Sequence, residues 1–369
     1  MPKSLSKSFK MLKKRPLLVI GIFVAILVLV VIAKTASFYP FLFHLFFDKE
    51  VKLKQSTPSN LNILILGIGG GSHDGPNLTD TIILANLNEE KNRVTLASIP
   101  RDLWVPDLNG ANKKINEAYA QGESKRKGGG LQLAKKIVEG VTGQNIDYGV
   151  RIDFSGFVKA VDIVGGLDII ADNTLDDYKY PISGKEDDVC GYSDEDIVAF
   201  SATVSAETEK QEKFACRYKH LHFDKGVNHM GGITALEYVR SRHAVGKEGS
   251  DFSRSKRQQK VITAFRDKIL SAQTLINPGK ILDLYAVLKG SIDTDIQSDE
   301  FDDFIRLAQK IKQATIQSAV VDTGDPINDR PGLLLEAPLT NEYDYLSVLI
   351  PRVGNGNFSE IKNYISCEI

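Results

Sequence analysis

A run of seventeen apolar residues, LLVIGIFVAILVLVVIA, lies between Pro16 and Lys34. At a rise of about 1.5 Å per residue, a helix of this length measures roughly 25 Å, close to the thickness of a bilayer core. The first 34 residues contain seven basic residues and no acidic one, and six of the seven precede the run. By the positive-inside rule, this pattern predicts a cytoplasmic basic segment over 1–15, a transmembrane anchor over 16–36 and an extracytoplasmic remainder.

Two alternatives to a retained anchor are disfavoured by the residues. A cleaved signal peptide has a shorter apolar stretch, and cleavage after Ala36 would place Lys34 at the third position before the cut. A soluble core helix is disfavoured because the run is both apolar on all sides and flanked by lysines. The segment that follows is SFYPFLFHLFF, with five Phe and one Tyr. Aromatic residues are typical of the membrane–water interface at the end of a transmembrane helix. We therefore expect a single-pass cell-membrane protein with its N-terminus in the cytoplasm.

The chain beyond the anchor is mildly acidic. The whole chain has a formal net charge of −1, and the first 34 residues contribute seven positive charges, so residues 35–369 carry −8. This charge argues against general binding to nucleic acid, which we do not expect as a partner. Any binding of phosphate must come from a local basic cluster.

Three cysteines suit an exported protein with at most one disulfide. Cys190 and Cys216 bracket a polar, acidic segment and could join its two ends, which would leave Cys367 over. The alternative is that Cys190 and Cys216 are free thiols. The sequence does not indicate a role for the segment between them.

Strand-like and helix-like segments alternate after a polar juxtamembrane stalk at 37–61. Buried strands are predicted in NILILG, TIILANL, RVTLASIP, DYGVRIDF and GLDIIAD. Helices are predicted in LQLAKKIVEGVTG, GGITALEYVR, SRSKRQQKVITAFRDKIL, EFDDFIRLAQKIK and FSEIKNYI. The alternation predicts an α/β or α+β fold with a mixed sheet. We expect a large domain over 62–285, with 286–369 as a C-terminal extension of the same domain.

Charged residues gather at the ends of several predicted elements. Asp80 stands at the mouth of an apolar strand, and Arg101 and Asp102 follow another strand in SIPRD. Lys114 opens the segment KINEAY, and a fourth group covers EYVRSRHAVGKEGSDFSRSKRQQ. Each group by itself has a structural alternative, such as a salt bridge, a turn cap or a solvated helix face.

Arginines dominate the fourth group. Arg240 and Arg242 are two residues apart, so an extended segment would place both on one face. Asp251 is expected to be the N-cap of the helix that follows it.

Within that helix, Arg254, Arg257 and Gln258 are spaced three and four apart and are expected to share a face. Guanidinium forks bind phosphoryl oxygens bidentately, and nearby carboxylates either orient the arginines or hold a divalent cation. Together, the groups predict a site for a phosphate diester or a pyrophosphate.

Several other chemistries are excluded by the motifs. The glycine run GIGGG is not followed by Lys-Ser/Thr, as a P-loop requires, and lacks the G-x-G-x-x-G spacing. No G-x-S-x-G motif is present for a serine nucleophile. The six histidines are interpreted as having no metal-ligand spacing.

At these residues the chain resembles the LytR-CpsA-Psr (LCP) family of membrane-anchored phosphotransferases. The resemblance runs from Asn62 to about Leu270 through NILILG, TDT, SIPRD, KINEAY, IDYGVRIDFSGF, VDIVGGLDI, GGITALEYVRSR and DFSRSKRQQ. It implies a catalytic domain that moves a glycopolymer from a polyprenyl-pyrophosphate carrier onto peptidoglycan through a phosphodiester bond. It also implies an apolar pocket for the lipid tail and a Mg²⁺ or Mn²⁺ cofactor.

The resemblance also implies roles for individual residues. Pyrophosphate binding is expected at Arg101, Lys114, Arg240, Arg242, Arg254 and Gln258. Arg101, Asp102 and Asp251 are the expected catalytic residues, the two aspartates orienting arginines or acting near the attacking hydroxyl. Asp80 is expected near the metal, and Asp74 is the second candidate ligand because Gly69 stands where the family commonly carries an aspartate.

Three alternatives to the transferase function belong to different classes. A hydrolase would release phosphate from polyprenyl pyrophosphate without an acceptor. A non-catalytic protein would bind or sense lipid-linked glycans. Transcriptional regulation is excluded because no helix-turn-helix is evident and the domain is expected outside the cell.

Overall fold

The computed structural model describes most of the chain beyond residue 50. The described ranges are 51–57, 59–71, 75–107, 110–203, 212–275, 277–325 and 330–369. The predicted basic segment at 1–15, the predicted anchor at 16–36 and Asp74 lie outside them. Within these ranges, no helix combines the length and the apolar character that crossing a membrane requires.

Contacts divide the chain into two compact units. The larger unit comprises Lys54–Ile296 and Lys310–Ile369, and the smaller comprises Met1–Leu53 and Gln297–Gln309. In the described part of the smaller unit, helix α13 (Phe301–Lys310) confirms the helix predicted in EFDDFIRLAQKIK. Its Arg306 forms ion pairs with Asp302 and Asp303 on the same helix.

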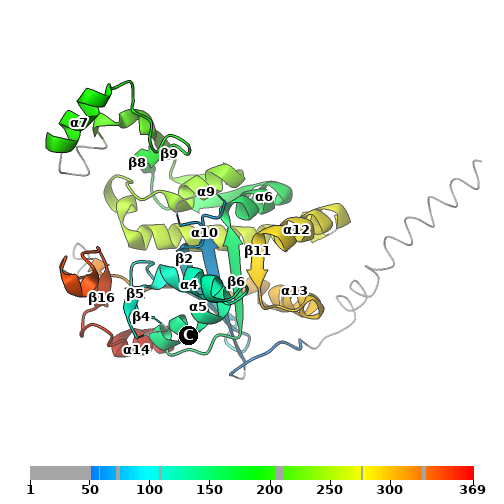
Figure 1. The fold of residues 1–369 in the computed structure, drawn as a ribbon. Helices are drawn as coiled ribbons and strands as arrows, with labels where there is room; N and C mark the ends of the chain where they lie inside the picture. The colour runs from blue at the N-terminus through cyan, green and yellow to red at the C-terminus, as the bar shows by residue number, and fades with distance from the viewer. Residues whose placement is uncertain are drawn as a thin grey trace, which may run out of the picture. The chain divides into compact units, whose positions relative to one another are not determined.

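A six-stranded mixed sheet forms the core of the larger unit (Figure 1). Its order is β11 (Ile292–Thr294), β6 (Tyr148–Asp153), β1 (Asn60–Ile68), β2 (Thr79–Asn88), β3 (Arg93–Ser98) and β12 (Thr315–Val320). β1 pairs antiparallel with β2 and parallel with β6, and β3 pairs parallel with β12. The predicted mixed sheet is confirmed, as are the strands predicted in its sequence.

Helices cover both faces of this sheet, which explains why β1 to β3 are apolar along most of their length. One face packs on α4 (Ala118–Lys125), α5 (Gly130–Thr142) and α14 (Ser359–Glu368) through a shared core. On the other face, α10 (Asp251–Ile269) is joined to β3 by Gln259, whose side-chain amide donates to the Leu96 carbonyl (2.9 Å).

A second hydrophobic core lies beside the sheet. It is built from α6 (Phe154–Val164), β7 (Leu167–Ala171), β8 (Leu175–Pro181), β9 (Tyr218–Phe223), β10 (Gly226–Met230), α9 (Gly232–Arg240), α10 and α12 (Pro278–Ser291). Helix α9 lies so close to α6 that a Cβ atom at Gly232 would come within 2.2 Å of the Val158 carbonyl oxygen. Only glycine permits this approach, which sets the position of the arginine at the other end of α9.

Short elements complete the larger unit. They are β4 (Trp104–Pro106), β5 (Asn112–Lys114), α11 (Ala272–Leu275), β13 (Gly324–Asp325), β14 (Arg330–Pro331), β15 (Leu334–Glu336) and β16 (Leu349–Pro351). Strand β4 pairs antiparallel with β5, and β15 with β16. The pairing of β4 with β5 places Lys114 directly opposite Trp104.

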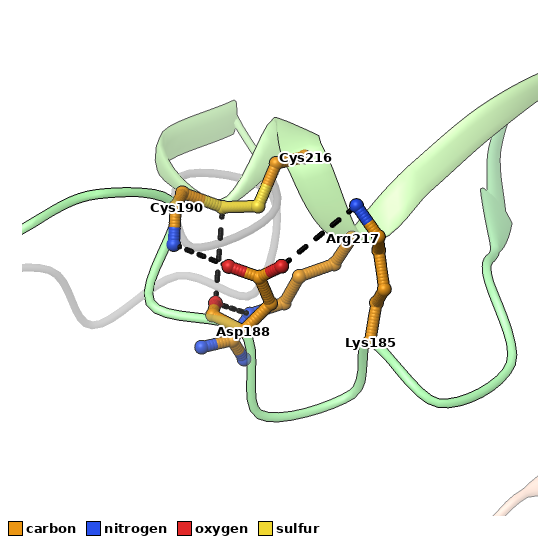
Figure 2. Close-up of a disulfide and its surroundings, with 5 residues drawn as sticks. All are labelled: Lys185, Asp188, Cys190, Cys216 and Arg217. Carbon is orange, nitrogen blue, oxygen red and sulfur yellow. Dashed lines mark hydrogen bonds and ion pairs between the residues drawn. A yellow bond between two sulfur atoms is a disulfide. The ribbon is translucent and has the colours of Figure 1, made fainter.

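The acidic segment between β8 and β9 is closed by the predicted disulfide. Cys190 and Cys216 are bonded, and the segment carries helix α7 (Asp194–Thr203). Figure 2 shows Asp188 beside the disulfide, where its backbone carbonyl accepts a hydrogen bond from Arg217 Nε (2.7 Å). The disulfide prediction is therefore confirmed, and Cys367 is free and exposed.

Candidate functional site

A cavity of about 310 Å³ lies among β2, the segment after β3, α9 and α10. Six residues singled out in the sequence line it, namely Asp80, Arg101, Arg240, Arg242, Arg254 and Gln258. Lining residues that the sequence did not single out include Thr81, Phe154, Asp177, Tyr180, Val239 and His243. Residues up to 178 positions apart thus meet in one cavity, which holds four guanidinium groups and two carboxylates.

Arg101 enters the cavity from a turn that directly follows β3. Leu103 N donates to the Pro100 carbonyl (3.2 Å) to close the turn, and the Arg101 carbonyl accepts from Asn116 N (3.2 Å). The Arg101 guanidinium forms an ion pair and hydrogen bond with Asp80. Burial works to lower the pKa of Arg101, but its interactions with Asp80 and Asp102 outweigh burial and raise it. Asp80 therefore orients Arg101.

Asp102 and Lys114 form a second ion pair behind the cavity wall. Lys114 Nζ lies 2.7 Å from Asp102 Oδ1, and Arg101 Nε lies 3.4 Å from Asp102 Oδ2. Burial works to raise the pKa of Asp102, but the Lys114 hydrogen bond and the charges of Arg101, Lys114 and Arg242 hold it below its ordinary value. Asp102 is therefore an ionised residue that positions Arg101, and Lys114 contacts Asp102 without lining the cavity.

Arg240 and Arg242 reach the cavity from the end of α9. Arg240 is the last residue of the helix, and Ser241 leaves it with φ −53° and ψ 129°. The expectation of one extended segment is therefore wrong for Arg240, although both side chains line the same cavity. The Arg240 guanidinium lies over the Phe154 ring, 4.6 Å from its centroid, in a cation–π contact.

Asp177 holds the backbone between these arginines and was not found from the sequence. It is fully buried on β8, and its carboxylate accepts from Ser241 Oγ (2.7 Å) and from His243 N (3.3 Å). The strand reads LDDYKYP, and its adjacent pair Asp176 and Asp177 was the only available signal. Nearby, burial raises the pKa of Tyr180, whereas the charge and hydrogen bond of Arg240 work to lower it.

Arg257 does not belong to the cavity, contrary to the expectation that it shares a face with Arg254. Its side chain is buried, and its guanidinium donates to the carbonyls of Tyr238 (3.1 Å) and Ser241 (2.8 Å). It also donates to the carbonyl and the carboxylate of Glu248, each at 2.8 Å. At three residues' separation, helical positions differ by about 60°, which here is enough to separate a cavity from a core. Arg257 fastens the loop that carries Arg242.

Arg254 and Gln258 are four residues apart on α10, and both line the cavity. Gln258 Nε2 donates to Thr81 Oγ1 (3.1 Å) on β2. The predicted N-cap at Asp251 is wrong, because Ser250 caps the helix by accepting a hydrogen bond from Ser253 N (3.1 Å). Asp251 is the first residue of the helix, and its side chain lies outside the described part.

The metal ligands expected from the resemblance are only partly within the described residues. Asp80 lines the cavity, whereas Asp74 lies outside the described residues and Gly69 offers no side chain. Two groups of three side chains in the described ranges could ligate a metal ion, and neither group lies at this cavity. Mg²⁺ is commonly held by one or two carboxylates together with substrate phosphates. Among the described residues, Asp80 fits such a partly substrate-held ion.

The volume of the cavity limits what it holds. Small-molecule pockets measure about 300–1,000 Å³, and this cavity lies at the lower end of that range. Its arginines suit a pyrophosphate, and Phe154 and Val239 provide an apolar wall beside them. The expected pocket for a complete lipid tail is not contained in this cavity.

The fold and the cavity define an α/β protein with an arginine-lined cavity. The model of the LytR_cpsA_psr family matches residues 45–332, well over half of the chain. The chain belongs to the LytR_cpsA_psr family, and the resemblance found in the sequence is confirmed.

Two curated relatives illustrate the distance within the family. The polyisoprenyl-teichoic acid–peptidoglycan teichoic acid transferase TagU of Bacillus cereus is 28% identical over 257 residues, which are 69% of this chain and 66% of that protein. The cell wall biosynthesis protein LcpA of Corynebacterium glutamicum is 26% identical over 306 residues, which are 75% of this chain and 50% of that protein. The chain thus spans between half and about two thirds of the length of these relatives.

The solved structures share the fold. The structure of TagT bound to LIIa-WTA has a TM-score of 0.52 at 21% identity and covers 87% of this chain and 95% of that chain.

Proposed function

We propose that this protein is a membrane-anchored phosphotransferase that moves a glycopolymer from a polyprenyl-pyrophosphate carrier onto peptidoglycan. The observation that carries the proposal is the convergence of Arg101, Arg240, Arg242 and Arg254 on one cavity. Two relatives support the class of substrate, since TagU of B. cereus is a polyisoprenyl-teichoic acid–peptidoglycan teichoic acid transferase and TagT has been solved bound to LIIa-WTA.

The proposed reaction is an exchange at phosphorus. A hydroxyl oxygen of the acceptor sugar forms a bond to the phosphorus that bears the glycan, and the P–O–P bond to the carrier breaks. The proton of the hydroxyl passes to solvent water, and polyprenyl phosphate leaves with the bonding electron pair. Negative charge grows on the equatorial and leaving oxygens, where preorganised guanidiniums stabilise it by electrostatics and hydrogen bonding.

The carboxylates around Arg101 have positioning roles in this mechanism. Asp80 and Asp102 both interact with Arg101 and hold its guanidinium at the cavity. Asp102 is paired with Arg101 and Lys114 and does not line the cavity, so we assign it a positioning role. Asp251, the first residue of α10, stays a candidate for a role near that hydroxyl.

A Mg²⁺ or Mn²⁺ ion remains part of the proposal. Asp80 would contribute a carboxylate ligand, with Asp74 as the second candidate, and phosphate oxygens would complete the coordination. When bound, the ion would neutralise charge on the pyrophosphate.

The proposal links the predicted anchor at 16–36 to the cavity. The anchor would hold the site on the outer side of the cell membrane, where a lipid carrier presents its pyrophosphate. Peptidoglycan is the proposed acceptor, and no nucleic acid is involved.

A transfer assay with the full chain in detergent micelles tests the proposal. The substrates are a glycan linked to polyprenyl pyrophosphate and a peptidoglycan acceptor, and the products to be measured are acceptor-linked glycan and polyprenyl phosphate. We expect both products in equal amounts. Arg101→Ala and Arg242→Ala should each reduce transfer by about a hundredfold or more, as losing an oxyanion donor does.

The matched control is Arg352→Ala. Arg352 is also an arginine in an ion pair, with Glu360 (2.6 Å), but it does not line the cavity, so transfer should be unchanged. Release of polyprenyl phosphate without acceptor-linked glycan would identify a hydrolase instead. Binding of the carrier without either product would identify a non-catalytic binding protein.

A further inference from the structure

The outward face of the β8–β9 hairpin carries an unusual set of side chains. Asp176 pairs directly with His222 across the two strands, and His220 lies two residues before His222 on β9. Because side chains alternate along a strand, His220 and His222 leave the same face. The intervening Leu221 and the neighbouring Asp177 are buried on the opposite face. The three outward residues therefore form one cluster at the surface.

The ligand atoms of this cluster converge on one point. Asp176 Oδ1 lies 2.8 Å from His220 Nε2 and 2.7 Å from His222 Nδ1. All three ligand atoms lie within 4.8 Å of one another. The expectation that the histidines share no metal-ligand spacing is wrong here, because His-x-His on a strand places two imidazoles side by side.

We propose that Asp176, His220 and His222 form a binding site for a divalent transition-metal ion of the Zn²⁺ class, distinct from the arginine cavity. Two imidazole nitrogens and one carboxylate oxygen suit Zn²⁺, Cu²⁺ or Ni²⁺, whereas Mg²⁺ and Ca²⁺ prefer oxygen ligands alone. Zn–N and Zn–O bonds measure about 2.0–2.2 Å, so tetrahedral ligand atoms stand roughly 3.3 Å apart. The two distances from Asp176 Oδ1 to the imidazole nitrogens need to open by only about half an ångström.

Two neighbours orient the imidazoles. His222 Nε2 lies 3.3 Å from Asp224 Oδ1, so the ring can donate to Asp224 while Nδ1 binds the ion. A carboxylate behind a ligating histidine fixes its tautomer and raises its basicity in many metal sites. The ring of Tyr178 stacks on His220, with centroids 4.1 Å apart and planes 8° apart.

The place of the cluster in the fold suggests what the ion does. Asp176 lies on the strand before the disulfide-closed segment and the two histidines on the strand after it, so a bound ion would cross-link β8 to β9. The Asp176 carbonyl also accepts a hydrogen bond from Val245 N (2.8 Å), and the adjacent Asp177 holds Ser241 and His243 at the cavity. The ion would therefore brace the strand that positions the arginine loop.

A metal titration of the full chain tests this site. The protein is purified in detergent without a polyhistidine tag, without reductant, and with Cys367→Ser to remove the exposed thiol. Binding of Zn²⁺ is followed by calorimetry and binding of Co²⁺ by its visible absorption, both in excess Mg²⁺. We expect one tight equivalent that Mg²⁺ does not displace.

Variants assign the ligands. His220→Ala, His222→Ala and Asp176→Asn should each weaken Zn²⁺ binding by at least about tenfold, and Asp224→Asn by about tenfold. The matched control is His229→Ala, because His229 and Asp168 form a similar exposed pair (2.7 Å) on β10 and β7 and belong to no group of three metal-ligating side chains among the described residues. Its affinity should equal that of the parent protein.

Thermal unfolding supplies an independent readout. Zn²⁺ should raise the Tm of the parent and of His229→Ala and leave the Tm of His222→Ala unchanged. Equal affinity in the parent and in a His220→Ala/His222→Ala double variant would overturn the proposal. Loss of the signal in excess Mg²⁺, or no binding by the parent protein, would overturn it as well.

Discussion

Helix α10 carries two pairs of residues with the same chemistry and opposite surroundings. Arg254 and Gln258 line the cavity, whereas Arg257 and Gln259 are buried. The buried guanidinium donates to three carbonyls and a carboxylate, and the buried amide donates to the Leu96 carbonyl and to Ser98. Residue type alone therefore does not tell a binding residue from a structural one. The direction that each side chain takes from the helix decides it.

The strongest test of this comparison is Arg257→Ala. It should destabilise the protein by about 3–5 kcal/mol, because removing one member of a buried ion pair leaves Glu248 and the backbone carbonyls without their partner. The measurement is thermal unfolding followed by the fluorescence of Trp104, the one tryptophan of the chain. Arg254→Ala is the matched control and should change the Tm little. Equal losses of Tm in the two variants would contradict the assignment.

Arg254→Ala should instead affect the proposed reaction. We expect transfer to fall by about a hundredfold at nearly unchanged stability, since a guanidinium at the cavity would stabilise charge in the transition state. The assay is glycan transfer at a temperature well below the Tm of both proteins. Full transfer by a folded Arg254→Ala variant would remove Arg254 from the proposed pyrophosphate site.

The two glutamines repeat the contrast on a smaller scale. Gln259→Ala should cost about 1–3 kcal/mol of stability, because it leaves buried partners on β3 unsatisfied. Gln258→Ala removes one hydrogen bond to the partly buried Thr81 and should cost less. Unfolding of both variants beside the parent measures the difference, and the reverse order would show that the burial of Gln259 contributes little.

The smallest effect is the pH dependence of stability that Asp102 contributes. Asp102 contacts Arg101, which lines the cavity, but does not line the cavity itself. Its pKa is lower in the folded protein than in the unfolded chain, so its contribution to stability is complete above the unfolded pKa of about 3.9 and is lost as pH falls through the folded pKa. Asp102→Asn should therefore lose about 1 kcal/mol at neutral pH and progressively less below pH 4. The measurement is the Tm of both proteins against pH. A constant difference down to acid pH would show that Asp102 is not an ionised partner of Lys114.

Much of the fold could be predicted because it depends on local patterns. The apolar runs of β1 and β2 and the helical periodicity of α5 and α9 are properties of neighbouring residues. The bracketing of a polar segment by Cys190 and Cys216 suggested their pairing but left free thiols open, and the structure shows the disulfide. The ends of elements were less predictable, as Ser250 caps α10 in place of Asp251.

The sequence predicted most residues of the candidate site but not how they are arranged. Arg101, Arg240 and Arg254 were singled out because arginines at the ends of elements suit phosphate. Asp177 was missed because its role depends on Ser241, which lies 64 residues away. The cluster of Asp176 with His220 and His222 was missed for the same reason, since the segment between the strands hides their pairing.

The sequence by itself determined the alternation of strands and helices, the family and the set of charged residues from which a phosphate site can be built. Only the tertiary structure decided that Arg254 lines the cavity while Arg257 fastens the loop, and that Asp102 positions Arg101 instead of standing in the cavity. The physical reason is that burial and hydrogen-bond partners come from residues distant in sequence, and these partners determine what a charged side chain does.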